Sequence, residues 1–287
     1  MLARLFVALQ YVLPRHGLTA LVHRIARIRT PFVKNALISG FVRLYDVDID
    51  DVRQKVPDDF ATFNDFFVRE LADGARPVAR DTAAIVSPVD GTVSIASSLE
   101  AHRILQAKGL SYTLDDLFAI DLREARAYAS GSFATIYLAP NNYHRVHMPL
   151  DGRLVAAHYV PGDLFSVNEA TVAHVPGLFR RNERVNLHFE TAGGPAALIF
   201  VGALNVGSIS TPWTGEIRPR KRGVVETLDI GAAPRELRKG DPLGWFNMGS
   251  TVILLLSEGA AEWHDTLQPG SSVKMGEAMG TLSGTGH

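Results

Sequence analysis

The chain has 287 residues, of which 46% are apolar and 21% are charged, so it suits one large globular domain or one domain with an appendage. Lysine and arginine total 29 against 30 aspartate and glutamate, and the formal net charge of −1 provides no global field that would recruit nucleic acid. The absence of cysteine excludes disulfides, thiolate metal sites, iron–sulfur clusters and cysteine nucleophiles. No apolar run reaches the roughly 18 residues of a spanning helix.

The first 45 residues are both basic and apolar, with seven lysine or arginine residues and no aspartate or glutamate. Within them, residues 18–28 have the spacing of an amphipathic helix. The expected apolar face comprises Leu18, Leu21, Val22, Ile25 and Ile28, and the expected polar face comprises Thr19, His23, Arg24 and Arg27. Such a helix is typical of proteins that bind an anionic membrane surface, where each lysine or arginine contributes about 1 kcal/mol.

Other interpretations of this segment stay open. The helix would also be stable packed on its own domain, with its basic face in water. A signal peptide is disfavoured, because Gln10 interrupts the apolar stretch before Pro14 and no A-x-A cleavage pattern follows. A transit peptide is compatible with the arginine-rich, acid-free composition.

The rest of the chain has mainly the pattern of short strands separated by turns. Phenylalanines at helical spacing predict a helix that ends near Leu71, with Thr62 as its N-cap, and TLDDLF (113–118) predicts a short helix opened by Thr113. Apolar runs predict strands at residues 85–93, 133–138, 154–160, 185–189, 196–206, 224–230 and 252–256. Too few long helices separate these runs for repeated βαβ units.

We therefore predict an α+β fold in which N-terminal amphipathic helices lie on a mainly antiparallel β core. The predicted domains are a helical membrane-associating segment at residues 1–72 and a β-rich catalytic domain at residues 73–287. We expect the tail from residue 280 onwards to be loose.

Two histidines occur close together in NNYHRVHMP (141–149), at His144 and His147. Histidine is the side chain best suited to proton transfer near neutral pH, so a catalytic use competes here with a structural one. The spacing of three also suggests metal binding, but residues i and i+3 of a strand point to opposite faces. No HExxH motif or further ligand cluster is present, and we expect no metal.

Two further residues would form a catalytic triad with His147. Asp90, in SPVDGTV (87–93), would orient the base His147, and Ser250, in MGST (248–251), would be the nucleophile. Taken singly, Asp90 suits an ordinary turn and Ser250 an ordinary start of a strand. Gly249 has no Cβ, which leaves its carbonyl open to attack by Ser250 and to conversion from amide to ester. The lipase motif G-x-S-x-G is absent, which argues against an α/β-hydrolase.

Eight stretches, in order along most of the chain, together resemble the phosphatidylserine decarboxylase family in its bacterial proenzyme form. They are FNDFFVREL (63–71), SPVDGTV (87–93), QAKGLSYTLDDL (106–117), YLAPNNYHRVHMP (137–149), YVPGDLFSVN (159–168), NERV (182–185), VGALNVGSI (201–209) and MGST (248–251). The serine motif of the family is usually LGST, and Met248 replaces its leucine here without changing the reacting pair.

The resemblance implies a self-processing enzyme. Asp90, His147 and Ser250 would form the charge-relay set that cuts the chain after Gly249. The products would be chains 1–249 and 250–287, and Ser250 would become a covalent pyruvoyl group. That cofactor forms a Schiff base with the substrate amine and accepts electrons as CO₂ leaves.

The implied reaction converts phosphatidylserine to phosphatidylethanolamine and CO₂. His144, which is close to His147 in sequence, is our candidate for the acid that reprotonates the product carbon. The implied partners are phosphatidylserine in an anionic membrane and the two cut chains as a heterodimer, with a higher oligomer left open and no nucleic acid. The expected location is peripheral, on the cytoplasmic face of the cell membrane.

Alternatives from other classes are a serine hydrolase that uses Asp90, His147 and Ser250 on an external ester, and a pyruvoyl decarboxylase of a soluble amino acid. A lipid-binding module without catalysis is a third. A lipoyl-type carrier is a weaker fourth, because no Met-Lys-Met or Asp-Lys-Ala hairpin follows PVDGTV.

Overall fold

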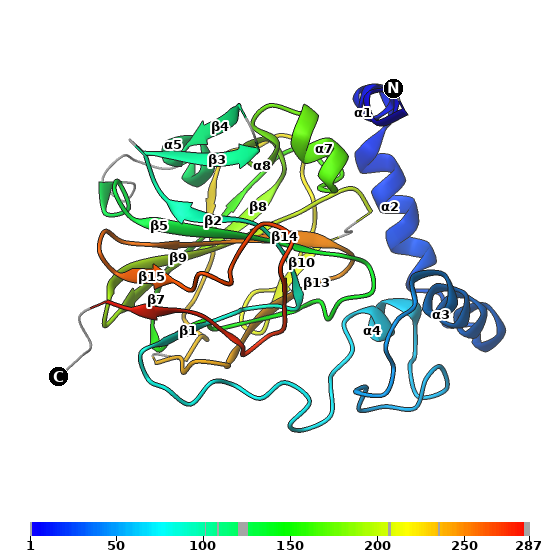
Figure 1. Ribbon diagram of the computed structural model, residues 1–287. Coiled ribbons are helices and arrows are strands. Elements are labelled where there is room, and N and C mark those ends of the chain that lie inside the picture. The colour runs from blue at the N-terminus through cyan, green and yellow to red at the C-terminus, as the bar shows by residue number, and fades with distance from the viewer. Residues whose placement is uncertain are drawn as a thin grey trace.

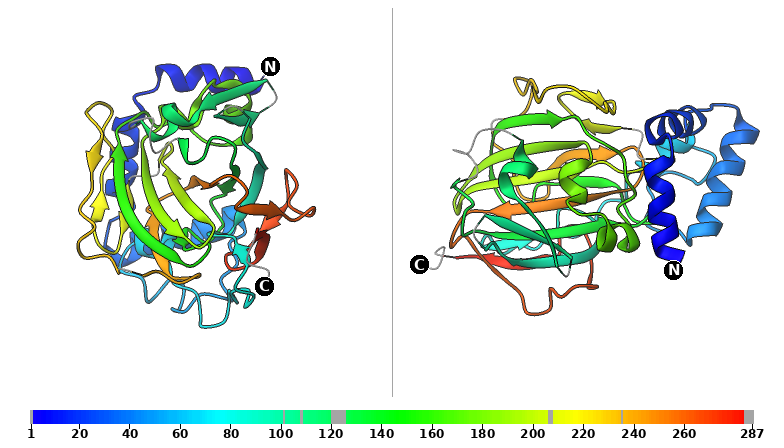
Figure 2. Two further views of the ribbon diagram at one scale, coloured as in Figure 1. Left: turned by 90° about the vertical axis from the view of Figure 1, so that its left-hand side faces the viewer. Right: turned by 90° about the horizontal axis from the view of Figure 1, so that it is seen from above.

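A computed structural model describes residues 2–100, 102–107, 109–119, 126–205, 208–234 and 236–283, and Figure 1 shows their arrangement. The helices are α1 (Leu2–Val12), α2 (Arg15–Ile25), α3 (Pro31–Tyr45), α4 (Phe63–Phe67), α5 (Leu114–Phe118), α7 (Glu169–His174) and α8 (Leu178–Arg181). The helices α1 to α4 gather on one side of a β body, and the C-terminal end of the chain lies on the opposite side (Figures 1 and 2).

The β body contains four sheets, and every pairing between its named strands is antiparallel. The first strands are β1 (Ala84–Val86), β2 (Gly91–Ser98), β3 (Arg103–Ala107), β4 (Leu110–Thr113), β5 (Ser132–Leu138), β6 (Arg145–His147), β7 (Gly152–Val160), β8 (Arg184–Thr191) and β9 (Gly194–Val201). The later strands are β10 (Ile209–Thr211), β11 (Gly215–Ile217), β12 (Glu226–Thr227), β13 (Pro242–Phe246), β14 (Ser250–Leu256), β15 (Ala261–Trp263), β16 (Ser272–Val273) and β17 (Ala278–Leu282). The predicted α+β class is confirmed.

The largest sheet has eight strands in the order β12-β7-β8-β9-β14-β5-β2-β16, and a four-stranded sheet has the order β11-β10-β13-β6. The remaining sheets are β1-β17-β15 and β3-β4. All seven residues of β14 are buried, and the strand pairs with β9 on one side and β5 on the other. The C-terminal part of the chain therefore contributes the middle of the largest sheet.

The helical part has a small core of its own. Its buried residues are Ala26, Ile38, Val47, Phe60, Phe63, Phe66 and Phe67, with Met248 packed against them from the β body. The predicted caps form, since the hydroxyls of Thr62 and Thr113 accept from the backbone N–H of Asp65 and Asp116. The division near residue 72 stays a prediction.

The helix predicted at residues 18–28 is present as α2, shifted towards the N-terminus, and it docks by its polar side. Its polar contacts are Arg15 with Asp163 (2.5 Å), Thr19 with the backbone N–H of Asn205 (3.1 Å) and His23 with Glu216 (2.8 Å). Thr19 is 1% exposed, whereas Leu21 and Ile25 are 52% and 40% exposed. The apolar edge of the helix therefore faces outwards.

Ten of the fourteen large apolar side chains that are exposed in the described part of the chain lie between residues 5 and 45. No single helix described here is long and apolar enough to cross a membrane. One pair of segments is long and apolar enough only when its members are taken together, namely Ala3–Val12 with Arg15–Ile25. The two are bent by 91° at their junction.

Several predicted elements were wrong in extent. The strand at 85–93 is divided into β1 and β2, because Pro88 has no N–H and the Ser87 hydroxyl donates to the Val89 carbonyl in a turn (2.6 Å). The run at 224–230 contributes only the two residues of β12, and the helix expected to end near Leu71 ends at Phe67. The expected loose tail is wrong for residues 280–282, which belong to β17, and residues 284–287 lie outside the described residues.

If the chain is cut between residues 249 and 250, we expect the 249-residue and 38-residue products (287 − 249 = 38) to stay together. The five apolar residues of β14, each stabilised by roughly 1.5–3 kcal/mol, hold the small product by burial on the order of 10 kcal/mol. Gel filtration without denaturant should give one peak that contains both products, and gel filtration in guanidinium should separate them. Loss of the small product without denaturant would contradict the packing argument.

Candidate functional site

Gly249 and Ser250 lie where the chain crosses from the four-stranded sheet to the eight-stranded sheet, since β13 belongs to the first and β14 begins at Ser250. Before the crossing, the backbone N–H of Asn247 donates to the Ser208 carbonyl (3.0 Å) and its side-chain amide donates to the Ser208 hydroxyl (2.7 Å). Its side-chain oxygen accepts from Asn64 (3.1 Å). Hydrogen bonds thus fix the chain on both sides of the Gly249–Ser250 peptide.

The Ser250 hydroxyl is buried and has no hydrogen-bond partner among the described residues. Both Gly249 and Ser250 line a cavity of about 180 Å³, together with Phe41 and Tyr45 from α3. A buried hydroxyl without a partner costs stability, so it calls for an explanation such as a reaction.

His144 is the histidine next to this peptide. A Cβ built on Gly249 would lie 3.9 Å from Nε2 of His144, and that nitrogen has no hydrogen-bond partner in the described structure. Nδ1 donates to the Asn142 carbonyl (2.9 Å), because a carbonyl can only accept. Neutral His144 therefore carries its lone pair on Nε2, at Gly249.

The surroundings of His144 keep it neutral. Burial, and then the positive charge of Arg69, lower the pKa of His144 to about 3, against a smaller rise from its bond to Asn142. The Phe67 ring packs on the imidazole, with 4.2 Å between ring centroids. Arg69, itself 3% exposed, donates to the Asn141 and Asn142 carbonyls (3.2 and 3.5 Å) and so supports the loop that holds His144.

His147 lies on β6, and both of its ring nitrogens have partners. Nδ1 donates to the Gly240 carbonyl (2.8 Å), and Nε2 accepts from the Tyr143 hydroxyl (3.1 Å). Burial lowers the pKa of His147, while its bond to Gly240 and the negative charge of Asp90 act in the opposite direction.

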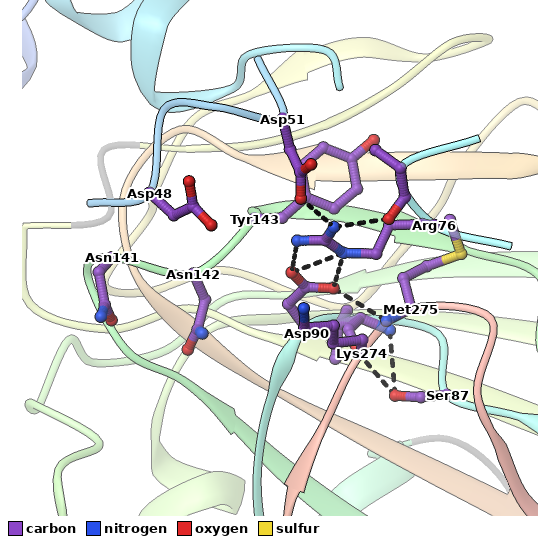
Figure 3. Close-up of polar contacts among 12 residues, drawn as sticks. Asp48, Asp51, Arg76, Ser87, Asp90, Asn141, Asn142, Tyr143, Lys274 and Met275 are labelled. Carbon is purple, nitrogen blue, oxygen red and sulfur yellow. Dashed lines mark hydrogen bonds and ion pairs between the residues drawn. The ribbon is translucent and has the colours of Figure 1, made fainter. Parts of the chain in front are cut away.

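Asp90 is the centre of an ionic network, shown in Figure 3. The Arg76 guanidinium donates to both carboxylate oxygens (Nε at 3.0 Å to each, Nη2 at 2.6 Å to Oδ2), and the backbone N–H of Met275 donates to Oδ1 (2.8 Å). Arg76 also donates to Asp51 (2.8 Å). These contacts connect the linker after the helices, the turn before β2 and the C-terminal segment.

The structure thus brings Ser250, Gly249 and His144 together. In the hydrogen bonds of the described residues, Asp90, His147 and Ser250 are not joined to one another. Their charge-relay roles stay predictions. Across residues 2–283, excluding the short stretches not described, no group of three side chains could hold a metal ion.

Several residues of the site escaped the sequence analysis. Arg76 and Tyr143 hold Asp90 and His147, and Arg69 and Phe67 surround His144. The stretches that carry the family resemblance include Phe67, Arg69 and Tyr143, so the resemblance could have marked them as candidate site residues. Arg76 lies outside them, in a turn, and only tertiary structure brings it to Asp90.

An apolar groove of about 440 Å³ lies next to the cavity. Its lining is Val22, Ile25, Ala26, Ala36, Leu37, Gly40, Phe41, Leu44, Phe63 and Met248, from α2, α3, α4 and their surroundings. Phe41 and Met248 line both the groove and the cavity at Ser250. An apolar surface between α2 and α3 therefore adjoins the space at the Gly249–Ser250 peptide.

Comparison with known proteins identifies the family. The family model described as phosphatidylserine decarboxylase matches residues 63–281, and a second, described as PSD, matches residues 5–46. This chain belongs to the phosphatidylserine decarboxylase family. It is accordingly a carboxy-lyase, and the family predicted from the motifs is confirmed.

Bacterial relatives match over nearly the whole chain. A phosphatidylserine decarboxylase proenzyme of Methylococcus capsulatus is 46% identical over 278 residues, covering 97% of this chain and 96% of the relative. The proenzyme of Alcanivorax borkumensis is 45% identical over 281 residues (98% and 97%), and that of Hahella chejuensis is 41% identical over 279 residues (97% and 94%).

The buried state of His144 predicts a pH dependence of stability. Because its pKa falls from 6.5 to about 3 on folding, the unfolded chain binds more protons between these values. The contribution of His144 is fully present above pH 6.5 and is lost as the pH falls towards 3. At pH 5 the loss is about 2 kcal/mol, since one pKa unit corresponds to about 1.4 kcal/mol.

We expect His144→Asn to flatten the fall in the free energy of unfolding between pH 6.5 and 5, measured by urea denaturation. All chains should carry Ser250→Ala so that their covalent state is the same. The exposed His174 provides the control His174→Asn, which should leave the slope unchanged. Equal slopes for all three proteins would contradict the assignment of a buried neutral His144.

Proposed function

We propose that the chain is a proenzyme that cuts itself between Gly249 and Ser250 and then decarboxylates phosphatidylserine to phosphatidylethanolamine and CO₂. The names of its relatives support this proposal. The observation that carries it is the buried Ser250 hydroxyl, which lacks a hydrogen-bond partner in the described structure and adjoins both Gly249 and a cavity.

In the proposed cut, the Ser250 hydroxyl oxygen attacks the Gly249 carbonyl carbon while a base takes the hydroxyl proton. The peptide C–N bond breaks and the nitrogen gains a proton, so the amide becomes an ester and the Ser250 amine is free. Removal of the Ser250 α-proton then expels the Gly249 carboxylate. Dehydroalanine remains, tautomerises to an imine and is hydrolysed by water to ammonia and an N-terminal pyruvoyl group.

The site fits a pyruvoyl group, because residue 250 lies on the wall of a cavity and its hydroxyl has no structural bond to lose. Such a group supplies an electron-withdrawing carbonyl that accepts the electron pair left by departing CO₂. The fixed positions of Asn247 and β14 would hold residue 250 at the cavity after the cut.

We assign the base of the cut to His147, as the family resemblance implies. Its Nε2 would exchange the Tyr143 hydroxyl for that of Ser250. Asp90 would act through its charge, which favours the protonated imidazole of His147. Arg76 holds that carboxylate in place.

We assign the proton transfers of decarboxylation to His144. Its unpartnered Nε2 lies beside Gly249 and is the atom that would deliver a proton to the carbon that has lost CO₂. Because burial and Arg69 keep the ring neutral at rest, Nε2 would receive that proton from the substrate ammonium group only once the substrate carboxylate offsets the positive charge of Arg69.

A lipid substrate must reach Ser250 from a bilayer. The apolar groove between α2 and α3 adjoins the cavity through Phe41 and Met248, which favours a diacyl substrate over a soluble amino acid. We infer that the exposed apolar side chains of α1, α2 and α3 lie in the cytoplasmic face of the cell membrane, whose anionic lipids attract the basic segment.

Different variants should abolish the cut and slow the decarboxylation. We expect intact-mass measurement in denaturant to give two chains for the wild type and one for Ser250→Ala and His147→Ala. His144→Ala should still be cut but should release CO₂ from phosphatidylserine at least about 100-fold more slowly, the usual scale of general acid–base catalysis.

Thr251 supplies a matched control, because its hydroxyl is also buried without a partner in the described structure. Thr251→Val should be cut like the wild type. An uncut His144→Ala chain would instead make His144 the base of the cut. A single wild-type chain that reacts at Ser250 with a fluorophosphonate probe would replace the proposal with a serine hydrolase.

Membrane contact should depend on the exposed apolar side chains. Phe32 is 84% exposed at the start of α3, and Val224, at 78%, lies in the β body. We expect Phe32→Asp to weaken flotation with phosphatidylglycerol-containing vesicles about tenfold or more, because burying such a side chain contributes roughly 1.5–3 kcal/mol. The control Val224→Asp should float like the wild type, and equal flotation of both variants would exclude this mode of contact.

A further inference from the structure

A second hollow, which we call the basic pocket, lies on the other side of α2 from the apolar groove. Its volume is about 470 Å³. Its lining is His16, Thr19, Ala20, His23, Arg24, Arg27, Arg218 and Pro219. None of these residues lines the cavity at Ser250 or the apolar groove, so the basic pocket is separate from the site of the reaction.

The basic pocket has an excess of positive charge. Three guanidinium groups line it, at Arg24, Arg27 and Arg218, and none of its lining residues carries a carboxylate. The carboxylate that contacts these cations is that of Glu216, while the charges of Asp65 and Asp163 also act on Arg27 and His16. Hydrogen bonds from Ser208 and His23 and the charge of Arg27 keep the pKa of Glu216 below its usual value despite its burial. The lining side chains and the carboxylate in contact with them thus contribute three positive charges and one negative charge before either histidine is protonated.

The carboxylate does not satisfy all of these cations. Glu216 accepts from Ser208 (2.5 Å), His23 (2.8 Å) and Arg27 (2.7 Å), all at Oε1. Arg218 reaches its other oxygen only at 3.8 Å. The Arg24 guanidinium has no hydrogen bond or ion pair with any residue that the structure describes. Unpaired guanidinium donors beside a hollow suit a phosphate group, which accepts several N–H donors at once.

The position of Arg24 favours a phosphate carried by a lipid. Arg24 lies one residue before Ile25 and three after Leu21, which are exposed on α2. Residues three apart on a helix are neighbours, so the cation adjoins the exposed apolar edge. A bilayer interface offers acyl chains to that edge and lipid phosphates to the pocket beside it, whereas a soluble phosphate ester would use the pocket alone.

We propose that the basic pocket binds the headgroup phosphate of an anionic phospholipid that is not being decarboxylated. This site rests on the membrane contact of α2 proposed above, and it is separate from the catalytic cavity. Its role is to hold α2 at the bilayer through Arg24 and Arg218 while the groove on the other side of the helix receives the substrate.

The test uses the full-length processed protein and dihexanoylphosphatidylglycerol below its aggregation concentration, followed by isothermal titration calorimetry. The wild type should show one saturable site. The double variant Arg24→Gln/Arg218→Gln should bind at least tenfold more weakly. The control Arg43→Gln/Arg80→Gln removes the same charge from exposed arginines outside the pocket and should bind within twofold of the wild type.

An equal loss of affinity in both double variants would overturn the proposal, because it would indicate a diffuse electrostatic field. The absence of a saturable site in the wild type would overturn it for the same reason. Titration with glycerol 3-phosphate distinguishes a lipid phosphate from a soluble phosphate ester. If glycerol 3-phosphate bound as tightly as dihexanoylphosphatidylglycerol, the pocket would be a site for a soluble ester. Intact mass and CO₂ release from phosphatidylserine in neutral detergent should be unchanged in Arg24→Gln/Arg218→Gln. A loss there would show that the pocket serves the reaction and would overturn its separation from the catalytic site.

Discussion

The pairing of β14 on both sides is the constraint on which the site depends. This strand lies between β5 and β9 in the middle of the largest sheet. Ser250 is opposite Leu138 of β5, and the pairing with β9 begins at the next residue, Thr251, so the chain is fixed directly after Gly249. Asn247 fixes the chain before the crossing through Ser208 and Asn64. Met248 and Gly249 therefore bridge two rigid sheets, and the peptide after Gly249 is held at a cavity instead of relaxing into a longer loop.

The two histidines occupy different electrostatic surroundings although they are three residues apart. Both donate from Nδ1 to a backbone carbonyl, which leaves Nε2 as the acceptor in each neutral ring. At His144 that acceptor is unpartnered beside Gly249 and next to the positive charge of Arg69. At His147 it meets Tyr143, and the negative charge of Asp90 offsets part of the cost of protonation. One ring is therefore kept neutral, while the other is easier to protonate.

The sequence predicted the fold class, the family and both helix caps, because periodicity and local capping patterns are properties of short segments. It missed the division of the strand at 85–93, although Pro88 is a local signal for a break in a strand. It also missed that residues 280–282 join a sheet, because their partner strand β1 lies far away in the chain. The pairing of Asp90 with Arg76 was equally hidden, because Arg76 lies in a turn with no pattern of its own. Predicting that Gly249 and His144 are neighbours required knowing that β14 and the loop after β5 meet.

The sequence also predicted the amphipathic character of α2 but not its orientation. Gln10, which interrupts the apolar stretch of α1, is 1% exposed and bonds to Thr171 and to the backbone of Ser166. Thr19 on α2 is buried in the same way. A helix that docked on a soluble domain through its apolar face would bury its apolar side chains and leave its polar side chains exposed. Polar bonds, together with Val7 and Tyr11 of α1, hold the two helices to the β body. The side chains that stay exposed on α1 and α2 therefore do not serve the protein's own core, and a bilayer is the environment that would stabilise them by burial.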